Sequence, residues 1–154
     1  MPNKPSNPAY LDGYPVVFHF SVTGLGGGDS DVKFQEVTGL SVEVETESFK
    51  EGGENRYTHM LPVRTKYTNL TLKRALIDDS KIITWCKDAI ENFNFKPKDI
   101  VVQLLNEKHQ ATMSWNIVRA YPIKWTFSNL DATKNELLLE TLTLSYSYFI
   151  FKPK

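Results

Sequence analysis

The chain has 154 residues, with 18 basic and 18 acidic side chains and a formal net charge of zero. This length suits one domain with a substantial core, and the balanced charge argues against a general nucleic-acid binder, which depends on excess positive charge. The single cysteine excludes an intrachain disulfide framework, and no apolar run approaches the ~18 residues of a membrane span. We therefore expect no signal peptide, no membrane anchor and folding in a cytosol.

The first 15 residues contain four of the eight prolines, set among small polar residues. This composition predicts an extended N-terminal arm, residues 1–15, rather than a folded element. Two interpretations of the arm stay open. It is either a floppy tail or a segment that packs on a neighbouring subunit.

Alternating apolar and polar residues then predict a strand over residues 16–23 and a second one from about residue 34. The apolar positions of the second strand change parity around Gly39, which indicates a bulge or kink. Beyond it, we expect the even positions Leu40, Val42 and Val44 to face the core. Residues 50–55, with two adjacent glycines, predict a turn, and residues 56–61 return as the partner strand until Pro62.

Charge is distributed unevenly along this predicted hairpin. Residues 34–55 contain six acids and one base, whereas residues 56–74 contain five bases and no acid. Pairing across the two strands of one hairpin explains this pattern, with each pair contributing a few tenths of a kcal/mol. Contacts between the acidic and basic faces of different copies of the chain explain it equally well.

A further strand is predicted over residues 67–74, and one helix follows it. Asp78, Asp79 and Ser80 are candidate N-cap residues, and residues 92–94 with Pro97 end the helix. Between them lies an apolar stripe at helical spacing, formed by Ile82, Ile83, Trp85, Cys86, Ala89, Ile90 and Phe93. Because Cys86 lies inside the stripe, we predict a buried structural thiol and not a nucleophile.

Three strands complete the pattern, over residues 99–106, 112–128 and 138–150, with a turn at 129–135. In the 112–128 strand the apolar residues at odd positions are expected in the core, namely Met113, Trp115, Ile117, Tyr121, Ile123, Trp125 and Phe127. In the 138–150 strand the even positions are expected there, namely Leu138, Leu142, Leu144, Tyr146, Tyr148 and Ile150. Strands much longer than the usual ~5–6 residues are typical of a barrel or of a sheet that continues beyond one subunit.

No group of residues predicts catalysis. His19, His59 and His109 lie in three separate predicted elements, and none has a second ligand at metal-binding spacing. The glycine-rich segment 24–28 is followed neither by a Gly-Lys-Ser/Thr motif nor by a helix, so it predicts a loop and not a phosphate site. We therefore predict that the protein is not an enzyme and has no catalytic residue, no cofactor and no metal.

Several segments resemble the tail tube proteins of contractile phages, extracellular contractile injection systems and R-type bacteriocins. They are FQEVTGL (34–40), EGGEN (51–55), YTNLTLKR (67–74), WNIVRAYPIKW (115–125), and LDAT (130–133) with ETL (140–142). The resemblance covers about residues 16–150. It implies a mainly β (α+β) fold, a small β-barrel of two packed antiparallel sheets with one flanking α-helix and a long extended β-hairpin. It also implies a single domain over residues 16–154.

In function, the resemblance implies a structural subunit of the inner tube of a contractile tail-like injection machine. Copies would form hexameric rings that stack into a hollow tube delivering DNA or a protein toxin. The implied partners are further copies of the chain, a contractile sheath protein, baseplate or tube-initiator proteins, cap proteins and the cargo. Assembly in the bacterial cytoplasm, as part of a virion or of a phage-tail-like particle that can be released, is implied as well.

Two alternatives stay open. Many shaft-tube members carry glycines at the positions of Val63 and Ala75, so the chain could instead form a baseplate-proximal initiator ring of the same fold. From another class of function, a monomeric β-barrel binding module is the alternative. Particle size separates a monomer of 17.6 kDa from a ring or tube.

The resemblance and the alternation together predict the residues of the assembly. In a closed ring, the side of an inner strand that faces away from the core is the channel wall, so Glu43, Glu45 and Glu47 are predicted to line the lumen. The turn and nearby basic residues are predicted to contact another ring or subunit. These residues are Lys50, Glu51, Gly52, Gly53, Glu54, Arg56 and Arg64.

Overall fold

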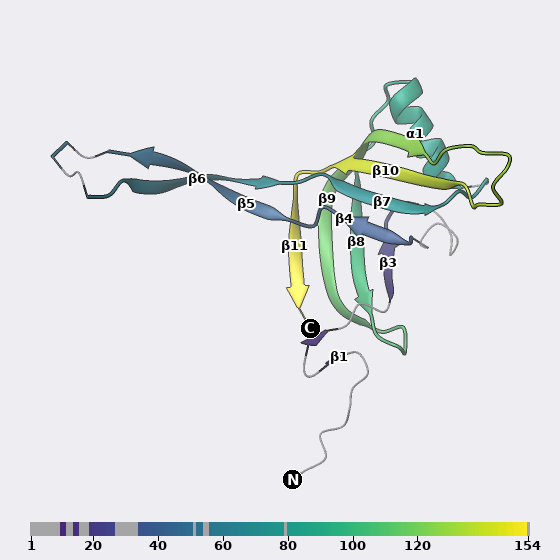
Figure 1. Ribbon diagram of the computed structural model, residues 1–154, viewed down its shortest axis with the longest axis horizontal. Coiled ribbons are helices and arrows are strands. Elements are labelled where there is room, and N and C mark those ends of the chain that lie inside the picture. Colours follow the sequence, from purple (N-terminus) through teal and green to yellow (C-terminus); the bar gives the residue numbers. More distant parts are fainter. Residues whose placement is uncertain are drawn as a thin grey trace, which may run out of the picture.

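The computed structural model describes residues 10–11, 14–15, 19–26, 34–50, 52–53, 56–78 and 80–153. In this part of the chain two antiparallel sheets share one long strand, a helix packs against them, and a two-stranded hairpin projects from the body (Figure 1). The mainly β fold with one flanking helix and a long hairpin, predicted above, is confirmed. Most of the predicted arm lies outside the described residues. The part of it that is described forms a short ladder between β1 (Tyr10–Leu11) and β2 (Tyr14–Pro15).

The two sheets differ in strand order. The first consists of β3 (His19–Thr23), β8 (Lys98–Leu105), the beginning of β9 (Ala111–Phe127) and β11 (Tyr148–Pro153). The second consists of the end of β9, β10 (Leu139–Ser145), β7 (Leu70–Ala75) and β4 (Glu36–Thr38). Among the described residues no ladder joins β3 to β4, so the implied barrel is open within one subunit.

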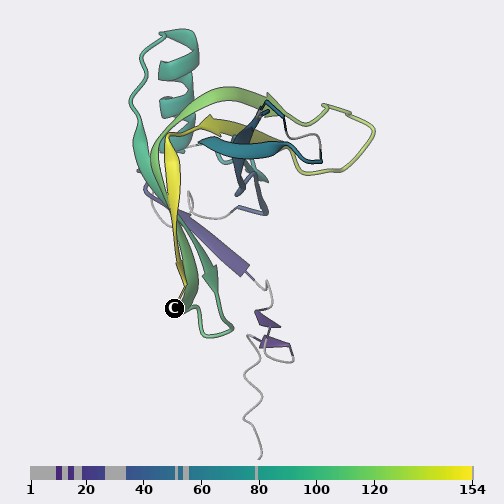
Figure 2. The same ribbon diagram turned by 90° about the vertical axis from the view of Figure 1, so that its left-hand side faces the viewer.

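A bulge bends β9 from one sheet into the other, as its arch in Figure 2 shows. Val118 and Arg119 stand opposite the single residue Asp99, and Arg119 has a positive φ of 57°. The Asp99 carboxylate accepts a hydrogen bond of 2.9 Å from the Arg119 backbone N–H, which stabilises this conformation. One inserted residue exchanges the two faces of a strand.

The parity predicted for β9 is therefore wrong beyond the bulge. Ala120 and Pro122, at even positions, are buried, whereas Ile123 is exposed. A second register shift, between Thr143 and Leu144 on the partner strand, returns Trp125 and Phe127 to the predicted side. Trp125 packs against the core there, but Phe127, the last residue of β9, is exposed.

The predicted 138–150 strand is also interrupted. It is divided at residues 146–147 into β10 and β11, so parity changes there too. Tyr148 and Ile150 are exposed, and Phe149 packs against the core in their place.

The helix α1 (Lys81–Glu91) has the predicted cap, because the Ser80 side chain accepts a hydrogen bond of 3.2 Å from the Ile82 N–H. Its buried face consists of Ile82, Trp85, Cys86 and Ala89. These side chains join a core formed with Val22, Leu25, Leu70, Leu72, Ile100, Val102, Ile117, Ala120, Leu142 and Leu144. The other end of the stripe was predicted wrongly, since Ile90 and Phe93 are exposed. Phe93 lies beyond the last turn of the helix and has a positive φ of 53°.

A buried ion pair connects this helix to the second sheet. Arg74 on β7 and Glu140 on β10 are 1% and 3% exposed, face each other across the ladder and form a salt bridge. Arg74 also donates to the Ser80 hydroxyl at 2.6 Å, and the Trp125 indole N–H donates to Glu140 at 3.0 Å. Satisfying both charges in this way permits their burial.

The buried thiol of Cys86 confirms the structural role predicted for it. Burial, together with the negative charge of Glu140, raises the pKa of Cys86 from 9.0 to about 12. In the unfolded chain the thiol ionises from about pH 9, whereas in the folded chain it stays protonated until about pH 12. Stability from this group is therefore complete below pH 9 and is lost as the pH rises toward 12.

We expect this linkage to be measurable by substitution. The difference in free energy of unfolding between the parent and Cys86→Ala should shrink between pH 8 and pH 10.5 in urea titrations, because only the parent has the ionising thiol. Subtracting the variant removes the contributions of lysines and tyrosines that titrate in the same range. A difference that is constant with pH would contradict the raised pKa.

Candidate functional site

The hairpin that projects from the body is formed by β5 (Val42–Phe49) and β6 (His59–Tyr67). It continues the edge of the second sheet, because β4 leads into β5 and β6 leads into β7. The chain turns between β4 and β5 at Gly39, which has a φ of +92°. A Cβ atom there would lie 1.9 Å from the Asn69 carbonyl oxygen, so this close approach requires glycine. The predicted kink at Gly39 is confirmed.

One face of the hairpin, which we call the charged face, carries its charged side chains near the body and Phe49, His59 and Leu61 toward the turn. The antiparallel register places Glu43 opposite Lys66 and Glu45 opposite Arg64, with Glu47 on the same face. Arg64 forms a salt bridge with Glu45, and the Lys66 ammonium lies 3.8 Å from Glu43 and 3.9 Å from Glu45. Cross-strand pairing within one chain is therefore present here. Because each pair contains at least one largely exposed side chain, it contributes only about 0–1 kcal/mol.

The opposite face of the hairpin is uncharged, and we call it the valine face. It consists of Val42, Val44, Thr46, Ser48, Met60, Pro62, Thr65 and Tyr67. Val42 is 46% exposed and Val44 is 55% exposed. The prediction that they face the core of their own subunit is wrong, because the hairpin extends past the end of the body. Leu40, at its base, does pack against the core.

The valine face continues toward the core side of the body. Tyr67, at its base, stacks edge-on against Tyr146 and Phe149, with ring centroids 6.0 and 5.2 Å away. The partner strand does not end at Pro62 as predicted. It runs on to Tyr67, and a register shift at Glu45 and Thr46 accommodates the proline, which has no N–H to donate.

The end of the hairpin carries the remaining predicted contact residues. Gly52 and Gly53 form the turn, and Gly53 has a positive φ of 104°. No atom lies within 4 Å of a Cβ built on either glycine, so the turn projects freely. Lys50 and Arg56 flank it and are exposed. Glu51 and Glu54 lie outside the described residues.

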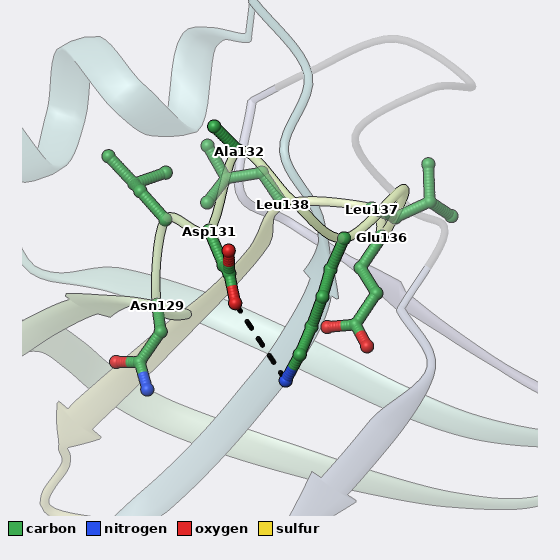
Figure 3. Close-up of a pocket in the computed structure, with 8 residues that line it drawn as sticks. Asn129, Asp131, Ala132, Glu136, Leu137 and Leu138 are labelled. Atoms are coloured by element: carbon green, nitrogen blue, oxygen red, sulfur yellow. Dashed lines mark ion pairs between the residues drawn. The ribbon is translucent and has the colours of Figure 1, made fainter.

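A pocket of about 340 Å³ is enclosed by the loop between β9 and β10 (Figure 3). It is lined by Asn129, Leu130, Asp131, Ala132, Lys134, Glu136, Leu137 and Leu138, all from this one loop. The Asp131 and Lys134 side chains approach to 3.9 Å across it, and hydrogen bonds from Thr133 lower the pKa of Asp131. An exposed ion pair and two exposed leucines supply no acid–base or nucleophilic pair, so the pocket does not indicate catalysis.

The histidines have two different environments. The rings of His19 and His109 meet with centroids 4.9 Å apart, although these residues are 90 positions apart in the sequence. His59 instead contacts Tyr57 on the hairpin. In the part of the chain that is described, no group of three or more His, Cys, Asp or Glu side chains could hold a metal ion. No described helix is long and apolar enough to cross a membrane.

Comparison with known proteins gives consistent similarities. The family model described as T4-like virus tail tube protein gp19 matches residues 16–150. A chain of the sheath–tube complex of PVC, an extracellular contractile injection system, in its extended state, superposes with a TM-score of 0.81 at 24% identity. That match covers 98% of this chain and 99% of that one. A search of curated protein sequences gave no significant match.

Two chains of the anti-feeding prophage are similar as well. One, from its baseplate, has a TM-score of 0.78 at 26% identity and covers 90% of this chain and 96% of that one. The other, from its tube-terminating cap, has a TM-score of 0.77 at 27% identity and covers 92% and 93%.

Proposed function

Because the chain belongs to the T4-like virus tail tube protein gp19 family, it is a structural component of a contractile tail-like particle, and we propose that six copies close into a ring. Rings of this kind stack into the hollow inner tube through which cargo passes. The chain serves this function mechanically, by holding a channel of constant bore, and uses no catalytic residue. The domain responsible is residues 16–154, with residues 1–15 as an arm that packs on a neighbouring ring.

The exposed valine face is the main evidence for the ring. A monomer would leave Val42, Val44 and Met60 in water, although burying each such side chain contributes roughly 1.5–3 kcal/mol. Among the described residues, the open sheet also leaves its edge strands β3 and β4 unpaired on one side. A second copy that covers the valine face and extends the sheet removes both defects, as closure does in barrels.

The charged face then remains in water, inside the ring. Glu43, Glu45 and Glu47 face away from the valine face, so covering the valine face places them on the channel wall. The freely projecting turn at Gly52 and Gly53, with Lys50, Glu51, Glu54 and Arg56, reaches the adjacent ring or subunit. Arg64 forms a salt bridge with Glu45 of its own hairpin, so any contact that it makes with another copy is in addition to this pair.

The partners follow from the place of such a tube in the particle. A contractile sheath protein surrounds it, baseplate or tube-initiator proteins begin it, cap proteins end it, and DNA or a protein toxin passes along it. Assembly takes place in the bacterial cytoplasm. A baseplate-proximal initiator ring is the second candidate, favoured by Val63 and Ala75 and by the similarity to a baseplate chain.

We expect Val44→Lys to abolish ring and tube formation while the subunit stays folded. Val44 is exposed in the subunit, so lysine costs the monomer little, but a covering copy would bury an unpaired charge. Light scattering after size-exclusion chromatography and negative-stain electron microscopy measure the result.

The matched control is the triple variant Glu43→Gln, Glu45→Gln and Glu47→Gln, which should still form rings because exposed ion pairs contribute little. Normal tubes from Val44→Lys, together with failure of the triple variant, would mean that the two faces of the hairpin have been exchanged. Both proteins remaining at 17.6 kDa, like the parent, would instead favour a monomeric binding module.

A further inference from the structure

We infer that the channel wall extends from the hairpin onto the outward face of the second sheet, and that its balanced charge fits a polypeptide cargo. The inference rests on the proposed tube and adds residues beyond those of the hairpin. Its basis is the register of four neighbouring strands, which places eight side chains in two rows on one face.

Both rows cross β9, β10, β7 and β4 in that order. The first row is Thr126, Thr141, Lys73 and Glu36. The second row is Lys124, Thr143, Thr71 and Thr38. All eight side chains are polar, and five of them are threonines. The face is therefore built to contact water and not a helix or a second apolar sheet.

The opposite face of the same sheet holds the core. Leu70, Leu72, Leu142 and Leu144 point there. The helix lies on that side too, because Ser80 at its N-terminus bonds to Arg74. The two threonine-bearing rows are thus turned away from α1, and in a tube whose channel lies on their side α1 faces outward.

The rows are continuous with the charged face of the hairpin. The valine face meets the core side of the body through Tyr67, Tyr146 and Phe149, so the charged face lies on the other side, with the rows. We call the combined surface the polar wall, although the exposed Phe49 and Leu61 also lie on it near the turn of the hairpin. Its charged members are the acids Glu36, Glu43, Glu45 and Glu47 and the bases Arg64, Lys66, Lys73 and Lys124.

Four acids and four bases make the polar wall electrically balanced, whereas the glutamates of the hairpin alone would make it acidic. Three of the four bases lie close to acids of the wall, including Lys73 at 3.8 Å from Glu36. The sixfold repeat of a ring would place both positive and negative charges at intervals around the bore. Between the charges lie threonine hydroxyls and methyl groups, which contact polar and apolar groups equally well.

This chemistry favours polypeptide over nucleic acid. A wall of uniform negative charge keeps a polyanion from adhering as it passes, but in this wall three of the four bases pair with acids, so that uniform repulsion is missing. A polypeptide carries both signs and apolar groups, so a balanced wall neither repels nor retains it strongly. Screening over a Debye length of about 8 Å at 0.15 M salt weakens what attraction remains.

The location of the wall can be tested with single cysteines, because the buried Cys86 does not compete for thiol reagents. In assembled, unsheathed tubes we expect Thr126→Cys to react with a small maleimide and to resist a maleimide attached to a 5-kDa polymer. The exposed Thr84→Cys on α1 should react with both reagents, and disassembled subunits of both variants should as well. Reaction of Thr126→Cys with the bulky reagent in intact tubes would overturn the inference alone, while absence of tubes would overturn the proposed function as well.

The charge balance can be tested by co-sedimentation of tubes with a single-stranded 20-mer oligonucleotide and with polylysine at 0.15 M salt. Parent tubes should retain neither probe. The glutamine variant of Glu43, Glu45 and Glu47 should retain the oligonucleotide, and Lys73→Gln with Lys124→Gln should retain polylysine. Lys87→Gln on the outward helix should behave as the parent. Retention of the oligonucleotide by parent tubes, or nuclease-protected DNA inside native particles, would overturn the assignment of a polypeptide cargo.

Discussion

Replacing Arg74 with methionine is expected to lower the free energy of unfolding by about 3–5 kcal/mol, the cost of leaving one member of a buried ion pair without its partner. Glu140 would remain 3% exposed and would lose the guanidinium that faces it across the ladder. Ser80 would lose its hydrogen bond to Arg74, and with it the direct connection between the helix N-terminus and β7. Urea denaturation followed by circular dichroism measures the change.

Two controls separate the buried charge from lost packing. Lys73→Met, at the neighbouring half-buried position of the same strand, should change stability by less than about 1 kcal/mol. The double variant Arg74→Met with Glu140→Leu should recover much of the loss, because an apolar pair needs no compensation. Equal stability of Arg74→Met and Lys73→Met would show that the ion pair is not required.

Replacing Trp85 with alanine is the second change with a large expected effect, a loss of about 3–5 kcal/mol in the free energy of unfolding. Trp85 is 6% exposed, and its indole N–H donates to the Lys96 carbonyl at 2.9 Å. The Lys98 ammonium lies 5.0 Å from the ring centroid, so the substitution also removes a cation–π contact. The cavity would open between α1 and the strand that follows it, and a thermal melt should show the lowered midpoint.

Phe93→Ala is the matched control for this prediction. Phe93 is an aromatic residue in the segment that immediately follows the same helix, but it is 82% exposed and packs edge-on against Phe95. Its substitution should change stability by less than about 0.5 kcal/mol, as surface substitutions do. A loss comparable to that of Trp85→Ala would mean that the end of α1 is buried in the protein as it exists in solution.

Most of the helix and strand positions could be predicted from the sequence, because the residue patterns that specify them lie within a few consecutive residues. The helix is predicted by Ser80, by the spacing of Ile82, Trp85, Cys86 and Ala89, and by the polar residues after Glu91. The strands are predicted by alternation, and the kink at Gly39 by the change of parity around a glycine. The predicted family is confirmed by the match over residues 16–150.

The faces of the strands could be predicted only as far as the first irregularity. Asp99 holds Arg119 in a bulge, and this contact joins residues 20 positions apart, so no pattern within β9 indicates it. Beyond Arg119, each apolar position was assigned to the wrong face until the second register shift. The exposed Ile123 is the result.

The candidate site shows the same division. Alternation by itself placed Val42 and Val44 on one face of a hairpin and Glu43, Glu45 and Glu47 on the other, because successive side chains of a strand point in opposite directions. Only the tertiary structure decided that the hairpin extends beyond the core of its own subunit, since this depends on where β7 and β10 end in space.

Tertiary structure also decided which charges lie together. Arg74 with Glu140, and Lys73 with Glu36, meet through strand order and register, which the chain acquires only when distant segments pair. Between such irregularities, sequence therefore determined which side chains share a strand face, because successive side chains point to opposite sides of the backbone. Folding determined what each face contacts, because burial is a property of the assembled sheets and not of any one strand.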